Sequence, residues 1–302
     1  MFNTSLTVIC NPADPILESA TLDKIDAALT PIVGEVARTT LAPKIAEDFL
    51  FASDQNIKSL QDAMAGQFSD LPVDVVIQPI AARKKRLLIA DMDSTIIEQE
   101  CIDELADFVG KRDEISEITE RAMRGELDFE AALTERVAML KGLPVEKMQQ
   151  AFDDRITLTP GARQLVQTMR AQGAFTALVS GGFTFFTERV AQSVGFHINK
   201  ANTLPIHDDH LTGNVGTPIL GRTAKEEALR NFVEEQDIPL VQTLAVGDGA
   251  NDLSMLGAAG LGVAFRAKPA VANAADASIN HGDLTALLYL QGIPQSAFET
   301  DQ

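Results

Sequence analysis

The sequence predicts an α/β fold built on a parallel sheet, preceded by a small α+β domain. Short and almost continuous apolar runs at 87–91, 175–180, 243–248 and 260–265 are typical of strands buried on both faces of a parallel sheet. Helical patterns separate these runs, as the crossovers between parallel strands require. The first 80 residues instead alternate short strands and helices at close spacing. We therefore expect two structural units.

The N-terminal unit, which we place at 1–82, reads as a ferredoxin-like α+β domain. Its pattern predicts the order β-α-β-β-α-β, with strands near 6–11, 36–43, 46–52 and 73–80, and helices near 21–32 and 56–68. The basic run 83–86 follows, and we interpret it as a solvated linker before the buried strand at 87–91. The second unit then occupies 83–302.

A long helical segment interrupts the second unit directly after its first strand. Residues 98–158 are charged, show helical periodicity and contain no strand pattern. A helical insertion at that place in the chain would lie over the carboxyl ends of the strands, so we interpret it as a cap. Residues 202–216 are predicted to form a β-hairpin with its turn near Asp208–His210.

Composition excludes several classes of function. A net charge of −18, the absence of Trp and a single Tyr argue against binding to nucleic acid or to an anionic membrane. No stretch approaches the roughly 20 apolar residues of a membrane-spanning helix, and we expect no signal peptide. The only cysteines, Cys10 and Cys101, lie far apart, which indicates no disulfide framework and a reducing, cytoplasmic location.

Two acidic residues stand immediately after the first buried strand. Asp91 and Asp93 are one residue apart at its carboxyl end, the edge at which open α/β sheets bind ligands. Two carboxylates in this position suit phosphoryl transfer, because one can attack through an aspartyl-phosphate while the other moves protons. The two can also share a divalent cation.

Polar residues follow two further strands and open one helix. Ser180 ends the run 175–180 and Gly181 follows it, and a hydroxyl beside flexible backbone favours an anion. Lys225 opens a helix and offers a compact positive charge. The run 243–248 ends in Asp248, whose carboxylate suits Mg²⁺. Asn251 and Asp252 follow it, and we expect Asp252 to orient a ligand or a water from behind. Parallel strands bring all these groups to one edge.

The order and spacing of these segments resemble the haloacid-dehalogenase-like (HAD) hydrolase superfamily over residues 87–302. The resemblance implies a Rossmann-like core with an inserted cap at about 98–158. Within the superfamily, DMDSTIIEQECIDELA at 91–106, MRGELDFEAALTERVAMLKGLP at 123–144 and LVSGGF at 178–183 resemble the phosphoserine phosphatase family. The N-terminal unit is similar, in the order of its elements, to the ACT-like domain attached to many members of that family.

The resemblance implies a role for each strand-end residue. Asp91 corresponds to the nucleophile, and Asp93 to the acid that protonates the leaving oxygen and then activates water. Mg²⁺ would be held by the carboxylates of Asp91 and Asp248 and by the backbone carbonyl of Asp93.

The remaining family positions concern the substrate. Ser180, Gly181 and Lys225 would hold the phosphate, with Asn251 beside them. Four residues of the insertion would form the serine pocket, Glu100 for the ammonium, Arg136 for the carboxylate, and Met123 and Phe129 as its apolar walls.

The implied function is Mg²⁺-dependent hydrolysis of O-phosphoserine, the last step of serine biosynthesis. Transfer of the phosphoryl group to homoserine, or hydrolysis of another small phosphate ester, is an alternative that the residues leave open. The expected partner is thus a small molecule, with neither nucleic acid nor membrane involved, and a homodimer is left open. The preference between Mg²⁺ and Mn²⁺ and a ligand-binding role for 1–82 are also open.

Overall fold

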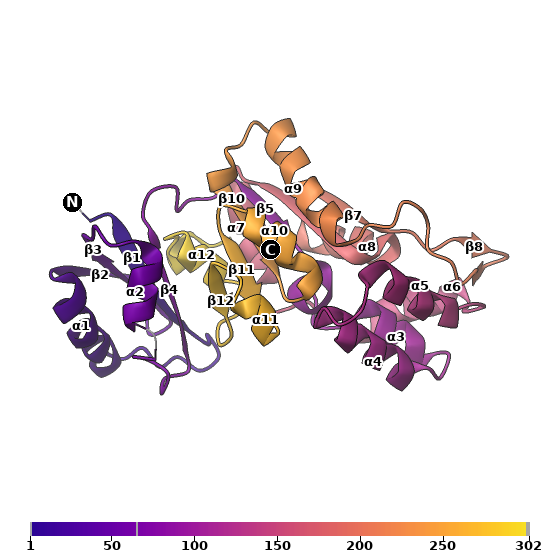
Figure 1. Ribbon diagram of the computed structural model, residues 1–302, viewed down its shortest axis with the longest axis horizontal. Helices are drawn as coiled ribbons and strands as arrows, with labels where there is room; N and C mark the ends of the chain where they lie inside the picture. The colour runs from indigo at the N-terminus through magenta and orange to yellow at the C-terminus, as the bar shows by residue number, and fades with distance from the viewer. Residues whose placement is uncertain (1, 65, 300–302) are drawn as a thin grey trace.

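The computed structural model describes residues 2–64 and 66–299. These residues form a four-stranded sheet, a six-stranded sheet, a small two-stranded sheet and a helical segment. Figure 1 shows the N-terminal unit at one end, the larger sheet with its helices in the middle, and the helical residues 101–155 at the opposite end. Within the described residues, none of the helices is both long and apolar enough to span a membrane.

The N-terminal unit is a four-stranded antiparallel sheet in the order β2-β3-β1-β4, as predicted for a ferredoxin-like domain. Its helices bury Ile25, Leu29 and Leu60 against the strands. Its elements are β1 (Thr4–Cys10), α1 (Ser19–Val33), β2 (Val36–Ala42), β3 (Ala46–Phe51), α2 (Ile57–Met64) and β4 (Val73–Pro79).

The core sheet has six parallel strands in the order β12-β11-β10-β5-β6-β7, which confirms the predicted fold class. The strands are β5 (Leu87–Ala90), β6 (Phe175–Phe183), β7 (Ile198–Asn202), β10 (Thr243–Gly247), β11 (Gly262–Phe265) and β12 (Ala277–Ile279). The sequence pattern indicated four of them. It missed the two edge strands, because β7 is polar and half-buried along most of its length and β12 has only three residues.

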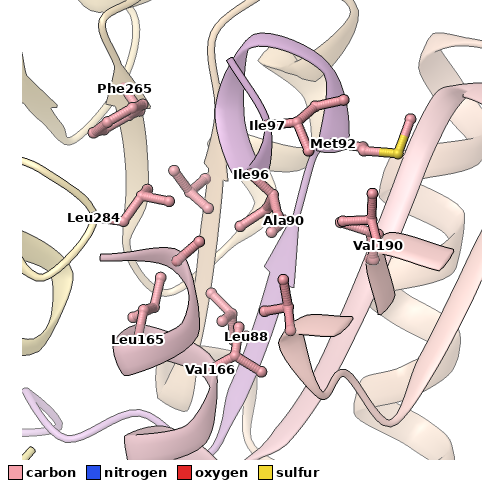
Figure 2. Close-up of a cluster of buried hydrophobic side chains, with 14 of the residues drawn as sticks. Leu88, Ala90, Met92, Ile96, Ile97, Leu165, Val166, Val190, Phe265 and Leu284 are labelled. Carbon is pink, nitrogen blue, oxygen red and sulfur yellow. The ribbon is translucent and has the colours of Figure 1, made fainter. Parts of the chain in front are cut away.

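Helices cover both faces of this sheet. Along β5, Leu87 and Ile89 enter one apolar cluster while Leu88 and Ala90 enter another, because successive side chains point to opposite faces. Figure 2 shows the second cluster, in which Leu88 and Ala90 lie among side chains from neighbouring elements. The core helices are α7 (Ala162–Ala171), α8 (Thr184–Val194), α9 (Arg222–Glu235), α10 (Leu253–Ala258), α11 (Pro269–Ala272) and α12 (Ala286–Leu290).

The insertion is helical, as the sequence predicts. It contains α3 (Cys101–Asp107), α4 (Arg112–Met123), α5 (Phe129–Met139) and α6 (Val145–Arg155). The two segments that connect it to the core lie side by side through a bridge between Ile97 and Leu158. The predicted hairpin is present as β8 (Ile206–His207) and β9 (His210–Leu211), and it reaches the insertion, since Gly142 N donates to Leu211 O at 2.8 Å.

The interpretation of 83–86 as a solvated linker is wrong for two of its four residues. Lys84 and Arg86 are exposed, but Arg83 and Lys85 are each only 8% exposed. Arg83 forms a bidentate ion pair with Asp48, and its guanidinium also donates to backbone carbonyls of the core. Arg83 therefore joins the two units, whereas the Lys85 ammonium donates within the core, to the backbone carbonyl of Val241 at 2.9 Å. The boundary between 82 and 83 stays a prediction.

Candidate active site

The first catalytic candidates lie in a tight turn at the carboxyl end of β5. Asp91 and Asp93 are both buried, and the segment from Met92 to Ile96 folds back on itself with Ser94 in the left-handed region at φ 53°. The backbone N–H of Met92 donates to Asp91 Oδ1 at 2.7 Å. The turn thereby fixes one oxygen of Asp91 and leaves Oδ2 for other partners.

The carboxyl-terminal part of β6 meets this turn. Ser180 Oγ donates to Asp93 Oδ2 at 3.1 Å and accepts from Gly182 N at 2.8 Å, while Cys101 N donates to Asp93 Oδ1 at 2.8 Å. A Cβ atom on Gly182 would stand 2.6 Å from Asp93 Oδ2, so only glycine allows this approach. Burial raises the pKa of Asp93, which favours a carboxyl group able to carry a proton.

Lys225 reaches the site from the first turn of α9 and is 1% exposed. Its Nζ lies 2.8 Å from Asp91 Oδ2 and 2.7 Å from Asp252 Oδ1. Burial lowers the pKa of this lysine, but the negative charges of Asp252 and Asp91 outweigh burial and raise it overall. The ammonium is therefore charged and points at the carboxylate predicted to attack.

An acidic cluster fits a divalent cation. Carboxylate oxygens of Asp91, Asp248 and Asp252, all buried, lie within 4.8 Å of one another. Burial and the charge of Asp252 raise the pKa of Asp248 to about 7, and the pKa of Asp91 is also raised well above its ordinary value. With three carboxylates facing the one ammonium of Lys225, negative charge is in excess, and oxygen ligands of this kind suit a hard cation.

This cluster differs in one respect from the predicted metal ligands. The sequence predicts that Asp252 orients the metal ligands from behind, but one of its carboxylate oxygens lies inside the cluster. Its carboxylate also accepts hydrogen bonds from Lys225 Nζ and from Gly249 N. The carboxylate of Asp93 faces Ser180 and Cys101 instead. The metal role of the Asp93 backbone carbonyl stays a prediction.

A cavity lies between the strand ends and the insertion. The structure brings together there nine of the predicted residues, Asp91, Asp93, Glu100, Met123, Phe129, Arg136, Ser180, Gly181 and Asn251. Three further predicted residues lie beside Asp91 behind the cavity wall, namely Lys225, Asp248 and Asp252. The side-chain oxygen Oδ1 of Asn251 is buried and has no hydrogen-bond partner among the described residues. It is therefore an acceptor available to a bound molecule.

Glu100 and Arg136 add one acidic and one basic side chain to the wall of this cavity. Ser94 Oγ donates to Glu100 Oε1 at 2.6 Å, and burial together with the charges of Asp93 and Asp248 raises the pKa of Glu100 well above its ordinary value. An ammonium group beside it would stabilise its charged form. Arg136 is 3% exposed, and in the ranges 2–64 and 66–299 it has no carboxylate within salt-bridge distance.

Sequence reasoning missed four residues of the cavity wall, namely Ile102, Leu133, Gly182 and Phe183. Gly182 follows Gly181 in the sequence, so its presence in the motif was a usable signal. Ile102 and Leu133 carry the same apolar periodicity as ordinary core residues, which gives no means of separating them from the interior of the insertion.

Comparison with known proteins identifies the family. The model of the haloacid dehalogenase-like hydrolases matches residues 88–257. The chain belongs to this family. A phosphoserine phosphatase of Streptomyces coelicolor is 42% identical over 269 residues, which is 88% of this chain and 65% of the relative. The chain spans 59–65% of the length of the first curated relatives that it matches.

Two solved structures resemble this member of the family. A phosphoserine phosphatase with a phospho-aspartyl intermediate analogue is 42% identical with a TM-score of 0.66, covering 68% of this chain and 98% of that one. An unliganded probable phosphoserine phosphatase from Vibrio cholerae is 31% identical with a TM-score of 0.76, covering 98% of this chain and 88% of that one. The second similarity therefore includes the N-terminal unit.

Proposed function

We propose that the protein is a Mg²⁺-dependent phosphatase that hydrolyses O-phosphoserine to serine and phosphate. The observation that carries the proposal is the cavity in which a carboxylate nucleophile candidate, Asp91, shares the wall with Glu100 and Arg136. Phosphoserine carries a phosphate, an ammonium and a carboxylate on a three-carbon frame, and the cavity offers a complementary group for each. The names of the curated relatives support the same substrate.

In the first half-reaction, Asp91 Oδ attacks phosphorus, and the bond from phosphorus to the seryl oxygen breaks. The electron pair of that bond stays on the seryl oxygen, which takes a proton from the Asp93 carboxyl. Lys225, the hydroxyl of Ser180 and the N–H of Gly181 hold the phosphate oxygens while this occurs. Phosphoryl transfer depends on such placement and charge neutralisation more than on covalent assistance.

In the second half-reaction, Asp93 takes a proton from water, and the water oxygen attacks the phosphorus of the aspartyl-phosphate. Phosphate leaves and the Asp91 carboxylate is restored. A divalent cation held by Asp91 and Asp248 would neutralise the charge that otherwise repels a phosphate dianion from a carboxylate. The insertion excludes water from the cavity until serine has left.

The proposal extends to the setting of the enzyme. The cysteines Cys10 and Cys101 are buried and free, which is consistent with a reducing, cytoplasmic location. We treat residues 1–82 as an ACT-like domain and 83–302 as the catalytic unit with its cap at about 98–158. Light scattering of the purified chain tests for a homodimer.

The test of the substrate is phosphate release from L-phosphoserine, phosphothreonine, glycerol phosphate and p-nitrophenyl phosphate, with Mg²⁺ and with EDTA. We expect a strong preference for phosphoserine and loss of activity in EDTA. Equal rates on all four esters would contradict the substrate, and activity that survives EDTA would contradict the metal. Adding homoserine to the reaction separates hydrolysis from transfer, because transfer would yield phosphohomoserine in place of free phosphate.

A further inference from the structure

Arg136 is held in the cavity wall by a hydroxyl group rather than by a carboxylate. Its Nη1 donates to Thr119 Oγ1 at 2.9 Å, and its Nε donates to the backbone carbonyl of Ala132 at 3.1 Å. Thr119 lies on α4 and is 3% exposed, whereas Arg136 lies on α5. One bond therefore fixes the guanidinium to its own helix and the other fixes it to the neighbouring helix.

The hydroxyl of Thr119 has two acceptors within reach, one of them the carboxylate of Asp103. Thr119 Oγ1 lies 2.9 Å from Asp103 Oδ1 and 3.0 Å from the backbone carbonyl of Ile115, so its single hydrogen is donated to one of these acceptors. Ser116 Oγ donates to Asp103 Oδ2 at 2.7 Å and holds that carboxylate in place. The oxygen of Thr119 is thereby turned with a lone pair toward Arg136.

This arrangement keeps the guanidinium available to a ligand. A direct bidentate pair with Asp103 would occupy the two parallel N–H groups that recognise a carboxylate. Thr119 instead accepts one N–H, and Asp103 acts on the charge of Arg136 through space. Within the described part of the chain, the hydrogen bonds of the guanidinium go only to Thr119 and Ala132, so N–H groups on both terminal nitrogens are left in the cavity wall.

We propose that Thr119 is a positioning residue for substrate selection, which orients Arg136 to receive the substrate carboxylate while Asp103 fixes the direction of the Thr119 hydroxyl. The inference rests on the proposed function and deepens it, because it assigns recognition of the substrate carboxylate to three connected side chains, Asp103, Thr119 and Arg136. Thr119 acts through Arg136 and contacts neither phosphate nor metal in this account.

The test compares Thr119→Val, Thr119→Ser and the matched control Thr134→Val. Thr134 lies on α5 with Arg136, is exposed, and bonds only to the carbonyl of Glu130 among the described residues. The substrates are L-phosphoserine and O-phosphoethanolamine, which has the same phosphate and ammonium but no carboxylate. We expect Thr119→Val to raise KM for phosphoserine about tenfold, as the loss of a hydrogen bond to a charged group predicts.

The same variant should leave kcat for phosphoserine and both constants for phosphoethanolamine unchanged. Thr119→Ser, which keeps the hydroxyl, and Thr134→Val should match the wild type on both substrates. If Thr119→Val does not fold, Asp103→Asn tests the same contacts, which run from Asp103 through Thr119 to Arg136. For this variant we expect KM to rise for phosphoserine alone, and by less than about tenfold.

Two results would overturn the inference while leaving the proposed function intact. One is an equal fall in kcat/KM for both substrates in Thr119→Val or, where that variant does not fold, in Asp103→Asn. The other is a Thr119→Ser variant whose KM for phosphoserine is as high as that of Thr119→Val. The proposed function fails in a different way. If the wild-type enzyme turned over O-phosphoethanolamine as efficiently as phosphoserine, the proposed binding site for the substrate carboxylate would be contradicted.

Discussion

Replacing Arg83 by Met tests how firmly the N-terminal unit is joined to the core. Arg83 Nη1 and Nη2 donate to the two oxygens of Asp48 at 2.6 and 2.8 Å. The same guanidinium donates to Thr7 Oγ1 at 2.8 Å and to the backbone carbonyls of Tyr289 and Leu290 at 3.0 and 2.6 Å. Asp48 and Thr7 belong to the N-terminal sheet, whereas 289–290 belong to α12.

The expected effect is large because the partners of Arg83 are buried. Arg83→Met keeps most of the apolar volume but leaves the Asp48 carboxylate with only the Thr7 hydroxyl as a side-chain donor. Breaking a buried ion pair by removing one partner costs about 3–5 kcal/mol. An exposed pair provides the matched control. Arg38 Nη1 lies 2.9 Å from Asp23 Oδ1 on the surface of the same domain. Such an exposed ion pair contributes less than about 1 kcal/mol to the free energy of unfolding.

Urea denaturation at pH 7 measures the free energy of unfolding for wild type, Arg83→Met and Arg38→Met. We expect a loss of about 3–5 kcal/mol for Arg83→Met and less than about 1 kcal/mol for Arg38→Met. The double variant Arg83→Met/Asp48→Leu should recover part of the loss, since it removes the stranded charge. Equal, small effects of the two single variants would refute the idea that Arg83 fastens the units together.

Three further predictions concern the site and the junction. Arg136→Ala should lower kcat/KM for phosphoserine roughly 100-fold but change that for p-nitrophenyl phosphate less than about threefold, because two charged hydrogen bonds to the carboxylate are lost; parallel losses on both esters would count against a carboxylate site. Gly182→Ala should lower kcat about tenfold or more, since its Cβ would stand 2.6 Å from Asp93 Oδ2, and unchanged turnover would show that the approach is not needed. Burial lowers the pKa of Lys85 to about 8, so the folded state binds fewer protons than the unfolded state between pH 8 and its ordinary value of 10.5. Stability should therefore rise with pH across that window in wild type by more than in Lys85→Met, as thermal unfolding would measure, and identical slopes would contradict the burial of its charge.

The part of the site on the strand ends was predictable because it depends on a general rule. Asp91, Ser180 and Asp248 each follow an apolar run, and parallel strands place such positions at one edge whatever the order of the strands. The structure brings these three residues together around Lys225 and the cavity. Their chemical roles stay a prediction until variants are assayed.

The junction of the two units was not predictable from local pattern. Arg83 looks like part of a solvated basic run, and its partners lie 35 residues before it and more than 200 residues after it. Burial of this charge is decided by tertiary contacts that no window of sequence contains. The same reason hid Thr119, a polar residue in a charged helix whose partner, Arg136, lies 17 residues away on another helix.

The edge strand β7 was missed for a related reason. Its sequence, INKAN, contains no apolar run, and Lys200 within it covers the ring of Phe232 at 4.7 Å from Nζ to the ring centroid. A lysine whose ammonium lies over an aromatic ring can cover that ring in place of the apolar residue that the strand pattern requires.

The most direct test of the account is to trap the covalent intermediate. Wild-type enzyme is mixed with radiolabelled phosphoserine and Mg²⁺, quenched in acid within the first turnovers, digested and analysed by peptide mapping. We predict label on the peptide that carries Asp91, and neither label nor turnover in a folded Asp91→Asn variant. Steady release of phosphate by Asp91→Asn, or label on the residue Asp93 instead, would contradict the assignment of Asp91 as the nucleophile.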